Sequence, residues 1–115
     1  MRFEKTPAFD ADWARLAPDE RRMFKEAVRE FSAACDRYAQ DPNVKWPGKL
    51  RVKKVESAEG VFELTWSFSG PDGRATWEWT NVEVEKKGPD GSETKVRYRA
   101  VRWRRVGTHR ILASP

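Results

Sequence analysis

The chain has 115 residues, of which 38% are hydrophobic and 36% are charged, and its formal net charge is +5. This length fits one domain spanning residues 1–115, and six tryptophans and six phenylalanines supply a core, which excludes a disordered chain. No apolar run approaches the roughly 18 to 20 residues of a membrane span, and the N-terminus lacks an apolar secretory stretch, so we expect a cytoplasmic protein without membrane contact.

Two helices are predicted after a short strand or extended arm over residues 1–9. Asp10 suits the N-cap of a helix over residues 10–16, and Pro18 suits the first turn of a second helix over residues 18–39. The lone cysteine, Cys35, is expected in the core and leaves too few soft ligands for a zinc site, so we expect no metal and no cofactor. The apolar residues of the second helix form one continuous stripe, namely Met23, Phe24, Ala27, Val28, Phe31, Ala34, Cys35 and Tyr38.

Four strands are predicted in the rest of the chain, over residues 50–56, 61–68, 74–85 and 95–106, with turn residues between them. In the last hairpin, pairing residues whose numbers sum to 180 joins apolar side chains, namely Trp77 with Trp103, Trp79 with Val101, Val82 with Tyr98, and Val84 with Val96. Halfway along both strands, the apolar residues change from odd to even positions or the reverse, and so from one face of the strand to the other. This change indicates a twist or paired bulge, beyond which the hairpin tip projects, near Thr80, Asn81, Arg99 and Ala100.

The preceding hairpin is predicted to pair residues whose numbers sum to 143, namely Phe68 with Ala75, Trp66 with Trp77, and Leu64 with Trp79. The apolar side chains then share one face, which the helical stripe must cover. We therefore expect an α+β fold with two N-terminal helices packed on one face of a twisted antiparallel sheet of four to five strands. The tryptophan cluster is expected in the core rather than as a platform for stacking bases.

Alternation places polar and cationic side chains on the opposite face of the sheet. The sequence has only one histidine, His109, which follows the last strand just beyond Gly107. The predicted register places Arg102 opposite Glu78 and Arg104 opposite Thr76. This face is either a solvated surface with cross-strand ion pairs or a binding surface for a polyanion, and a sequence pI of about 9.6 favours nucleic acid. Its members are Arg51, Lys53, Glu63, Thr65, Ser67, Thr76, Glu78, Arg102 and Arg104.

Three short motifs resemble the RelE/ParE superfamily of bacterial toxins. The ending Arg104-Arg105-Val106-Gly107-Thr108-His109 is similar to the Arg-x-Gly-Thr-His ending of YafQ-like members, with Arg105 in the arginine position. The stretch from Gly60 to Trp66 is similar to the family strand with Gly, aromatic, Leu and aromatic residues. Arg51-Val52-Lys53 resembles the basic, apolar, basic triplet of RelE, and the order of strand, two helices and antiparallel strands also resembles the family.

The resemblance implies the toxin of a type II toxin–antitoxin pair, an endoribonuclease that cleaves mRNA on the ribosome. A ribose 2′-OH attacks its own 3′-phosphodiester, and no metal is needed. The implied partners are a cognate antitoxin, mRNA and the ribosome. His109 would be the general acid or base, and Arg105 or Arg104 would stabilise the phosphorane-like charge. The RNA backbone would be held by basic residues, namely Arg51, Lys53, Lys54 and Arg102.

The chain departs from the family pattern at two positions. Glu63 stands where RelE has an arginine, and it would either act as a base or pair with Lys53. Ala113 stands where YafQ-like members have an aromatic residue, so base stacking would come from elsewhere. Two alternatives stay open: a ParE-like toxin that inhibits DNA gyrase without cutting nucleic acid, against which His109 argues, and a catalytically inactive RNA-binding module on the same fold.

Overall fold

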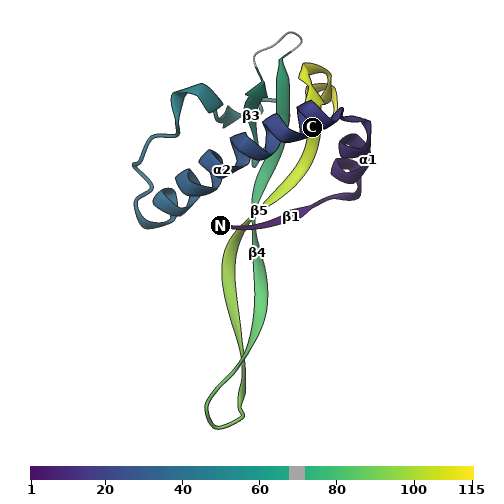
Figure 1. The fold of residues 1–115 in the computed structure, drawn as a ribbon. Helices are drawn as coiled ribbons and strands as arrows, with labels where there is room; N and C mark the ends of the chain where they lie inside the picture. Colours follow the sequence, from purple (N-terminus) through teal and green to yellow (C-terminus); the bar gives the residue numbers. More distant parts are fainter. Residues whose placement is uncertain (68–71) are drawn as a thin grey trace.

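Two helices and a five-stranded sheet form the fold in the computed structural model, which describes residues 1–67 and 72–115 (Figure 1). The sheet order is β1-β5-β4-β3-β2, and the helices pack against one face of the sheet. None of the helices in the described residues is long and apolar enough to cross a membrane. The elements in chain order are β1 (Arg2–Lys5), α1 (Pro7–Arg15), α2 (Pro18–Gln40), the 3-10 helix η1 (Gly48–Leu50), β2 (Lys53–Lys54), β3 (Val61–Ser67), β4 (Gly73–Lys87), β5 (Glu93–Thr108) and the 3-10 helix η2 (His109–Ala113).

The N-terminal strand differs from the predicted antiparallel arrangement, because β1 runs parallel to β5 and makes the sheet mixed. The first helix also begins earlier than predicted. Thr6, not Asp10, is its N-cap: the Thr6 hydroxyl accepts from the Phe9 amide at 3.1 Å and donates to the Arg104 carbonyl at 2.8 Å. Pro7 suits the first helical position because it has no amide hydrogen to satisfy. Asp10 lies in the first turn instead.

The second helix begins at Pro18 as predicted and continues one residue beyond the predicted end. Its N-cap residue, Ala17, has no polar side chain, and the Glu20 carboxylate accepts from the Ala17 amide at 2.8 Å instead. The predicted apolar stripe is confirmed, because Phe24, Ala27, Phe31, Ala34 and Cys35 are buried. Burial raises the pKa of the Cys35 thiol to about 12, as expected of an inert core cysteine.

The core is a stack of aromatic rings between α2 and the sheet. Phe31 lies 4.9 Å from Trp77 and 5.4 Å from Trp103, and Phe24 lies 5.2 Å from Trp103, measured between ring centroids. Trp66 lies on the same side at 6.1 Å from Phe24. The prediction that the tryptophans face the helices is therefore confirmed for these three residues.

The pairing of β4 with β5 follows the predicted register from Trp77 opposite Trp103 to the hairpin tip. The predicted bulge near Thr80, Asn81, Arg99 and Ala100 is wrong, because these residues pair without a register shift. Val82 and Val84 instead lie on the face of the sheet opposite the helices, with their partners Tyr98 and Val96. The hairpin tip projects from the rest of the molecule as predicted (Figure 1).

The register shift in this hairpin lies nearer the sheet centre, between Thr76 and Trp77. Thr76 therefore pairs with Arg105, and the prediction that it faces Arg104 is wrong. One residue of β5 is extra at this height, and such a bulge turns two successive side chains in different directions.

The predicted pairing of β3 with β4 is displaced by four residues. Leu64 pairs with Ala75 rather than Trp79, and Phe62 takes the place opposite Trp77. The last pair is Ser67 with Gly73, and Phe68, the predicted partner of Ala75, lies outside the described residues. Over residues 61–65 the displacement is an even number of residues, which keeps the side chains on their predicted faces, and a register shift between Thr65 and Ser67 then changes the pairing at the end of β3.

The strand predicted over residues 50–56 is reduced to Lys53–Lys54, paired with Glu63 and Phe62. Leu50 ends η1, and Arg51 follows with a left-handed backbone, at φ 46°. A residue in this conformation cannot continue an extended strand, which explains the late start of β2.

We predict that Gly73→Ala destabilises the fold. A Cβ atom at this position would lie 2.5 Å from the buried Trp66 indole, whose Nε1 donates to the Arg74 carbonyl at 2.8 Å. Overpacking of this kind costs about 1 to 3 kcal/mol of the free energy of unfolding, measured by urea denaturation. Gly48→Ala is the matched control, since nothing lies within 4 Å of its added Cβ. Equal stability of both variants would contradict the packing described.

Candidate nucleic-acid interface

The face of the sheet opposite the helices is called the outer face here, and it carries a row of polar side chains across four strands, from β2 to β5. Lys53 of β2 pairs with Glu63 of β3, and Glu63 pairs with Thr76 of β4. Glu78 and Arg102 continue the face toward β5. The sequence-predicted polar face is therefore present, but several of its members are buried, namely Glu63, Thr65, Ser67 and Thr76.

Glu63 lies between two cations. Its Oε1 is 3.5 Å from the Lys53 ammonium and 3.9 Å from Arg74 Nε. The Glu63 side chain is 7% exposed, whereas the Lys53 side chain is 66% exposed. Of the two predicted roles for Glu63, the structure supplies the pairing with Lys53. The carboxylate thus pairs with the ammonium of Lys53, whose side chain stays largely exposed to a ligand.

Arg74 is the outer-face residue that the sequence analysis missed. Its Nη1 donates to the Thr65 hydroxyl at 2.5 Å, its Nη2 lies 3.6 Å from Asp72, and its side chain is 11% exposed. Its Nε is buried and makes no hydrogen bond with the described residues. The sequence does predict this position, because Arg74 begins the predicted strand two residues before Thr76, and alternation places both side chains on the same face.

Glu78 binds two arginines of β5 and confirms the predicted cross-strand pair with Arg102. Arg102 Nη1 lies 2.8 Å from Glu78 Oε1, and Arg104 Nη1 lies 2.7 Å from Oε2. Burial raises the pKa of Glu78, but the hydrogen bonds from Arg104 and Arg102 outweigh it and leave the pKa below its usual value. Glu4 of β1 also binds Arg102, at 3.2 Å. The hydrogen bonds from Glu78 and Glu4 raise the pKa of Arg102.

Arg105 pairs with Thr76 beside the bulge, and its side chain binds α1 rather than Glu78. Its Nε and Nη2 donate to the two carboxylate oxygens of Asp12 at 2.6 and 3.0 Å, and the Val106 amide donates to the same carboxylate at 3.1 Å. Asp12 is 6% exposed, and its hydrogen bond raises the pKa of Arg105. Arg104 remains on the outer face, where its Nε donates to the Pro115 carbonyl at 3.0 Å. The two candidate arginines therefore have different surroundings.

His109 is exposed at the start of η2, immediately after the end of β5. Thr108 is the N-cap of η2 and pairs with Gly73, the first residue of β4. His109 therefore lies at the end of the sheet where β4 begins. A Cβ on Gly107 would lie 3.0 Å from Ile111 Cγ2, and the absence of a side chain there lets η2 fold back over the strand. Arg110, the next residue, is also exposed.

The remaining predicted RNA-binding residues separate from this face. Lys54 pairs with Phe62, whose ring stacks on Trp77, so alternation places Lys54 on the helix side of β2. Arg51 is exposed in the left-handed turn before β2. The structure therefore brings Lys53, Arg102 and Arg104 onto one face and leaves Lys54 off it.

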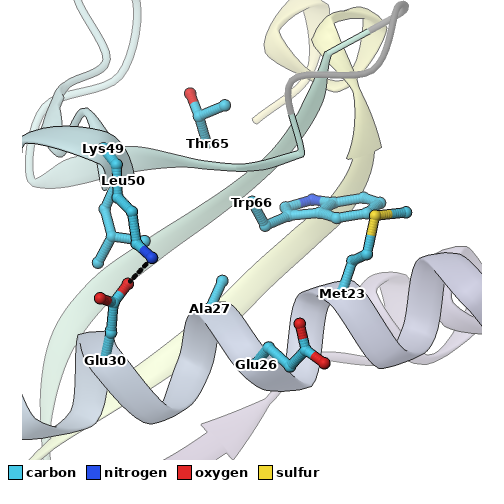
Figure 2. Close-up of a pocket in the computed structure, with 8 residues that line it drawn as sticks. All are labelled: Met23, Glu26, Ala27, Glu30, Lys49, Leu50, Thr65 and Trp66. Atoms are coloured by element: carbon cyan, nitrogen blue, oxygen red, sulfur yellow. Dashed lines mark ion pairs between the residues drawn. The ribbon is translucent and has the colours of Figure 1, made fainter.

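Several hollows border the sheet. A cavity of about 360 Å³ lies beside Arg104 and Arg105, and Ser114 and Pro115 also line it. A second cavity, of about 470 Å³, lies between α2, η1 and β3 (Figure 2). The Lys49–Glu30 ion pair, at 3.1 Å, bridges one side of it, and Glu26 adds a second carboxylate. The first cavity suits an anion better, because its charged lining residues are arginines.

Comparisons with protein-family models, with curated proteins and with solved structures found no match to this chain. Within the described residues, no group of three or more His, Cys, Asp or Glu side chains could hold a metal ion.

We predict that Asp12→Ala lowers the free energy of unfolding by about 3 kcal/mol, because it leaves Arg105 and the Val106 amide without their carboxylate. Urea denaturation measures the change. Asp10→Ala is the control in the same helix: its carboxylate binds Lys5 at 2.9 Å but is 54% exposed, and its loss costs less than about 1 kcal/mol. An Asp12 variant as stable as the control would show that Arg105 does not anchor α1.

Stability should also depend on the charge of Glu78. Because the folded state lowers the pKa of Glu78, its contribution is complete above the unfolded pKa of about 4.3 and is lost as the pH falls through the lower folded value. The difference in unfolding free energy between the wild type and Glu78→Gln should therefore shrink in acid. Urea titrations from neutral pH to about pH 3 measure it. If the difference in unfolding free energy stays constant with pH, the stabilising contacts of Glu78 with Arg102 and Arg104 are contradicted.

Proposed function

We propose that this protein is an endoribonuclease toxin of a type II toxin–antitoxin pair, which cleaves mRNA on the ribosome by metal-independent attack of a ribose 2′-OH. One observation carries the proposal: cations of β2 and β5 share the outer face, and the single histidine of the chain is exposed where that face ends. Phosphodiester transfer needs both positive charge and a group that exchanges a proton near neutral pH.

The spacing of these groups suits an extended RNA strand. Arg102, Arg104 and His109 are distributed over seven residue steps, which correspond to about 20 Å of extended strand. Lys53 lies three strands away from β5, at about 14 Å across the sheet. Several phosphates, rather than one, would therefore contact the outer face.

Arg104 is the arginine that best fits contact with RNA. Its hydrogen bonds to Glu78 and to the Pro115 carbonyl use Nη1 and Nε, and Nη2 makes no hydrogen bond with the described residues. A guanidinium held in this way donates to a phosphate oxygen without reorganising. Arg105 supports the site from behind, since Asp12 accepts from its Nε and Nη2 and the Ser114 carbonyl accepts from its Nη1.

His109 carries the proton transfer in this proposal. It is exposed and adjoins Arg110, so it can reach a ribose 2′-OH or a leaving 5′ oxygen on a bound strand. A positioned acid or base of this kind contributes about 10² to 10⁴ in rate. Glu63, which faces two cations, serves here to hold Lys53 rather than to take a proton.

We predict that His109→Gln lowers cleavage of ribosome-bound mRNA by at least about 10²-fold while leaving ribosome binding unchanged. Arg104→Ala should lower cleavage by a similar factor through lost charge stabilisation. Single-turnover cleavage at several pH values measures both. Arg97→Ala, which removes one exposed cation from the hairpin tip, controls for net charge. If His109→Gln cleaves as well as the wild type, the assigned role of His109 is wrong.

Binding should weaken steeply with salt, because phosphate contacts release counterions from RNA. Lys53→Ala is expected to reduce the slope of log K against log salt by about one, whereas Arg97→Ala leaves it unchanged. Titration of labelled RNA or ribosomes by fluorescence anisotropy at several salt concentrations measures the slope. A slope near zero, or equal slopes for both variants, would exclude Lys53 as a phosphate contact.

A second candidate, an inactive RNA-binding module, is favoured by one observation. Arg102, Arg104 and Arg105 each bind a carboxylate, which offsets part of the positive charge of β5. Such a module would bind ribosomes with the same salt dependence but leave the mRNA uncut. The cleavage assay on wild-type protein therefore separates the two candidates directly.

A further inference from the structure

The distal part of the last hairpin, over residues 81–99, is a two-stranded ribbon with no neighbouring strand. β3 pairs with β4 no further than Glu78, and β1 pairs with β5 only from Ala100 onward. Figure 1 shows this ribbon extending away from both helices. The core therefore does not require the ribbon, and its side chains can serve another purpose.

On one face of the ribbon, positive and negative side chains neutralise each other's charge. Three directly opposed residue pairs on this face have opposite charges, and we call it the charged face. Opposite charges at directly paired positions stabilise a two-stranded ribbon and suit a surface in contact with water. The pairs are Glu83 with Arg97, Glu85 with Lys95, and Lys87 with Glu93.

The other face of the ribbon carries apolar side chains and cations but no carboxylate. Val82 pairs with Tyr98, and Val84 pairs with Val96, and all four side chains are partly exposed. We call these four residues the apolar face of the ribbon.

Two cations lie over Tyr98. The guanidinium carbon of Arg2 is 4.5 Å from the Tyr98 ring centroid, and the Lys86 ammonium is 5.4 Å from it. Neither Arg2 nor Lys86 forms an ion pair with another described residue. The apolar face thus combines exposed hydrocarbon with two positive charges that no acid of the described chain neutralises.

We propose that the apolar face of the ribbon binds an acidic segment of a partner protein, with apolar side chains on Val82, Val84 and Val96 and carboxylates on Arg2 and Lys86. Charge complementarity selects this occupant. A second copy of the chain, packed face to face, would bring like charges together. Nucleic acid is a poorer fit, because residues 81–99 contain five cations and four carboxylates, and phosphates cannot use the valines. The proposal does not depend on nuclease activity.

The test uses full-length protein and a fluorescein-labelled peptide of four Val-Glu repeats as the probe. The peptide should bind the wild type, and a peptide of four Val-Lys repeats should not. The double variant Val84→Thr with Val96→Thr should weaken binding about tenfold, since it removes apolar surface from the contact while keeping β-branched residues in the ribbon. Glu85→Gln, on the charged face, is the matched control and should bind like the wild type.

Any of four results would overturn the proposal. The first is failure of the Val-Glu peptide to bind the wild type, and the second is equal binding by the threonine double variant, whose fold is checked by its amide NMR spectrum. The third is a wild-type dimer in sedimentation that the threonine variant loses, which would assign the face to a second copy. Chemical shift changes in the ribbon caused by the Val-Glu peptide, and not by a single-stranded RNA oligonucleotide, would support the acidic partner. Equal or larger changes with RNA would contradict it.

Discussion

The packing of Trp103 determines where β5 lies, and the rest of the structure depends on that strand. Four phenylalanine rings surround its indole, with centroids between 5.2 and 6.2 Å away, and they come from β1, α1 and α2. Aromatic contacts of this kind contribute about 0.5 to 1.5 kcal/mol each beyond burial. Because side chains alternate along a strand, a buried Trp103 obliges Arg102 and Arg104 to face the other way. The core thus positions the cations of the outer face.

The β-bulge beside Trp103 separates two neighbouring arginines that the sequence presents as equivalent. Without the extra residue, Arg105 would lie on the core face, where an unpaired guanidinium would be costly. The bulge instead directs Arg105 to Asp12, which also accepts from the Val106 amide. One arginine then anchors a helix, and the other stays available on the outer face. This division of roles rests on a backbone irregularity of one residue.

Much of the fold followed from periodicity, and the errors have identifiable physical causes. The stripe of α2 and the pairing of Trp77 with Trp103 were predictable because burial imposes a regular spacing. The pairing of β3 with β4 was not, since a shift by four residues keeps every side chain on its face and leaves the hydrophobic pattern unchanged. The parallel pairing of β1 with β5 and the Asp12–Arg105 ion pair join residues far apart in sequence. The spacing of residues within one helix or strand does not reveal such contacts. Arg74 was visible as an alternating strand residue, but its buried contacts with Thr65 and Glu63 required the structure.

The end groups of the RNA products test the proposed chemistry most directly. Attack by the ribose 2′-OH leaves a 2′,3′-cyclic phosphate upstream and a 5′-hydroxyl downstream, and it fails when the attacking hydroxyl is replaced by hydrogen. Ribosome-bound mRNA incubated with the protein should therefore be cut to these ends, and a single 2′-deoxy substitution at the cleaved nucleotide should abolish cutting. Intact mRNA, or products with a free 3′-hydroxyl, would contradict the account.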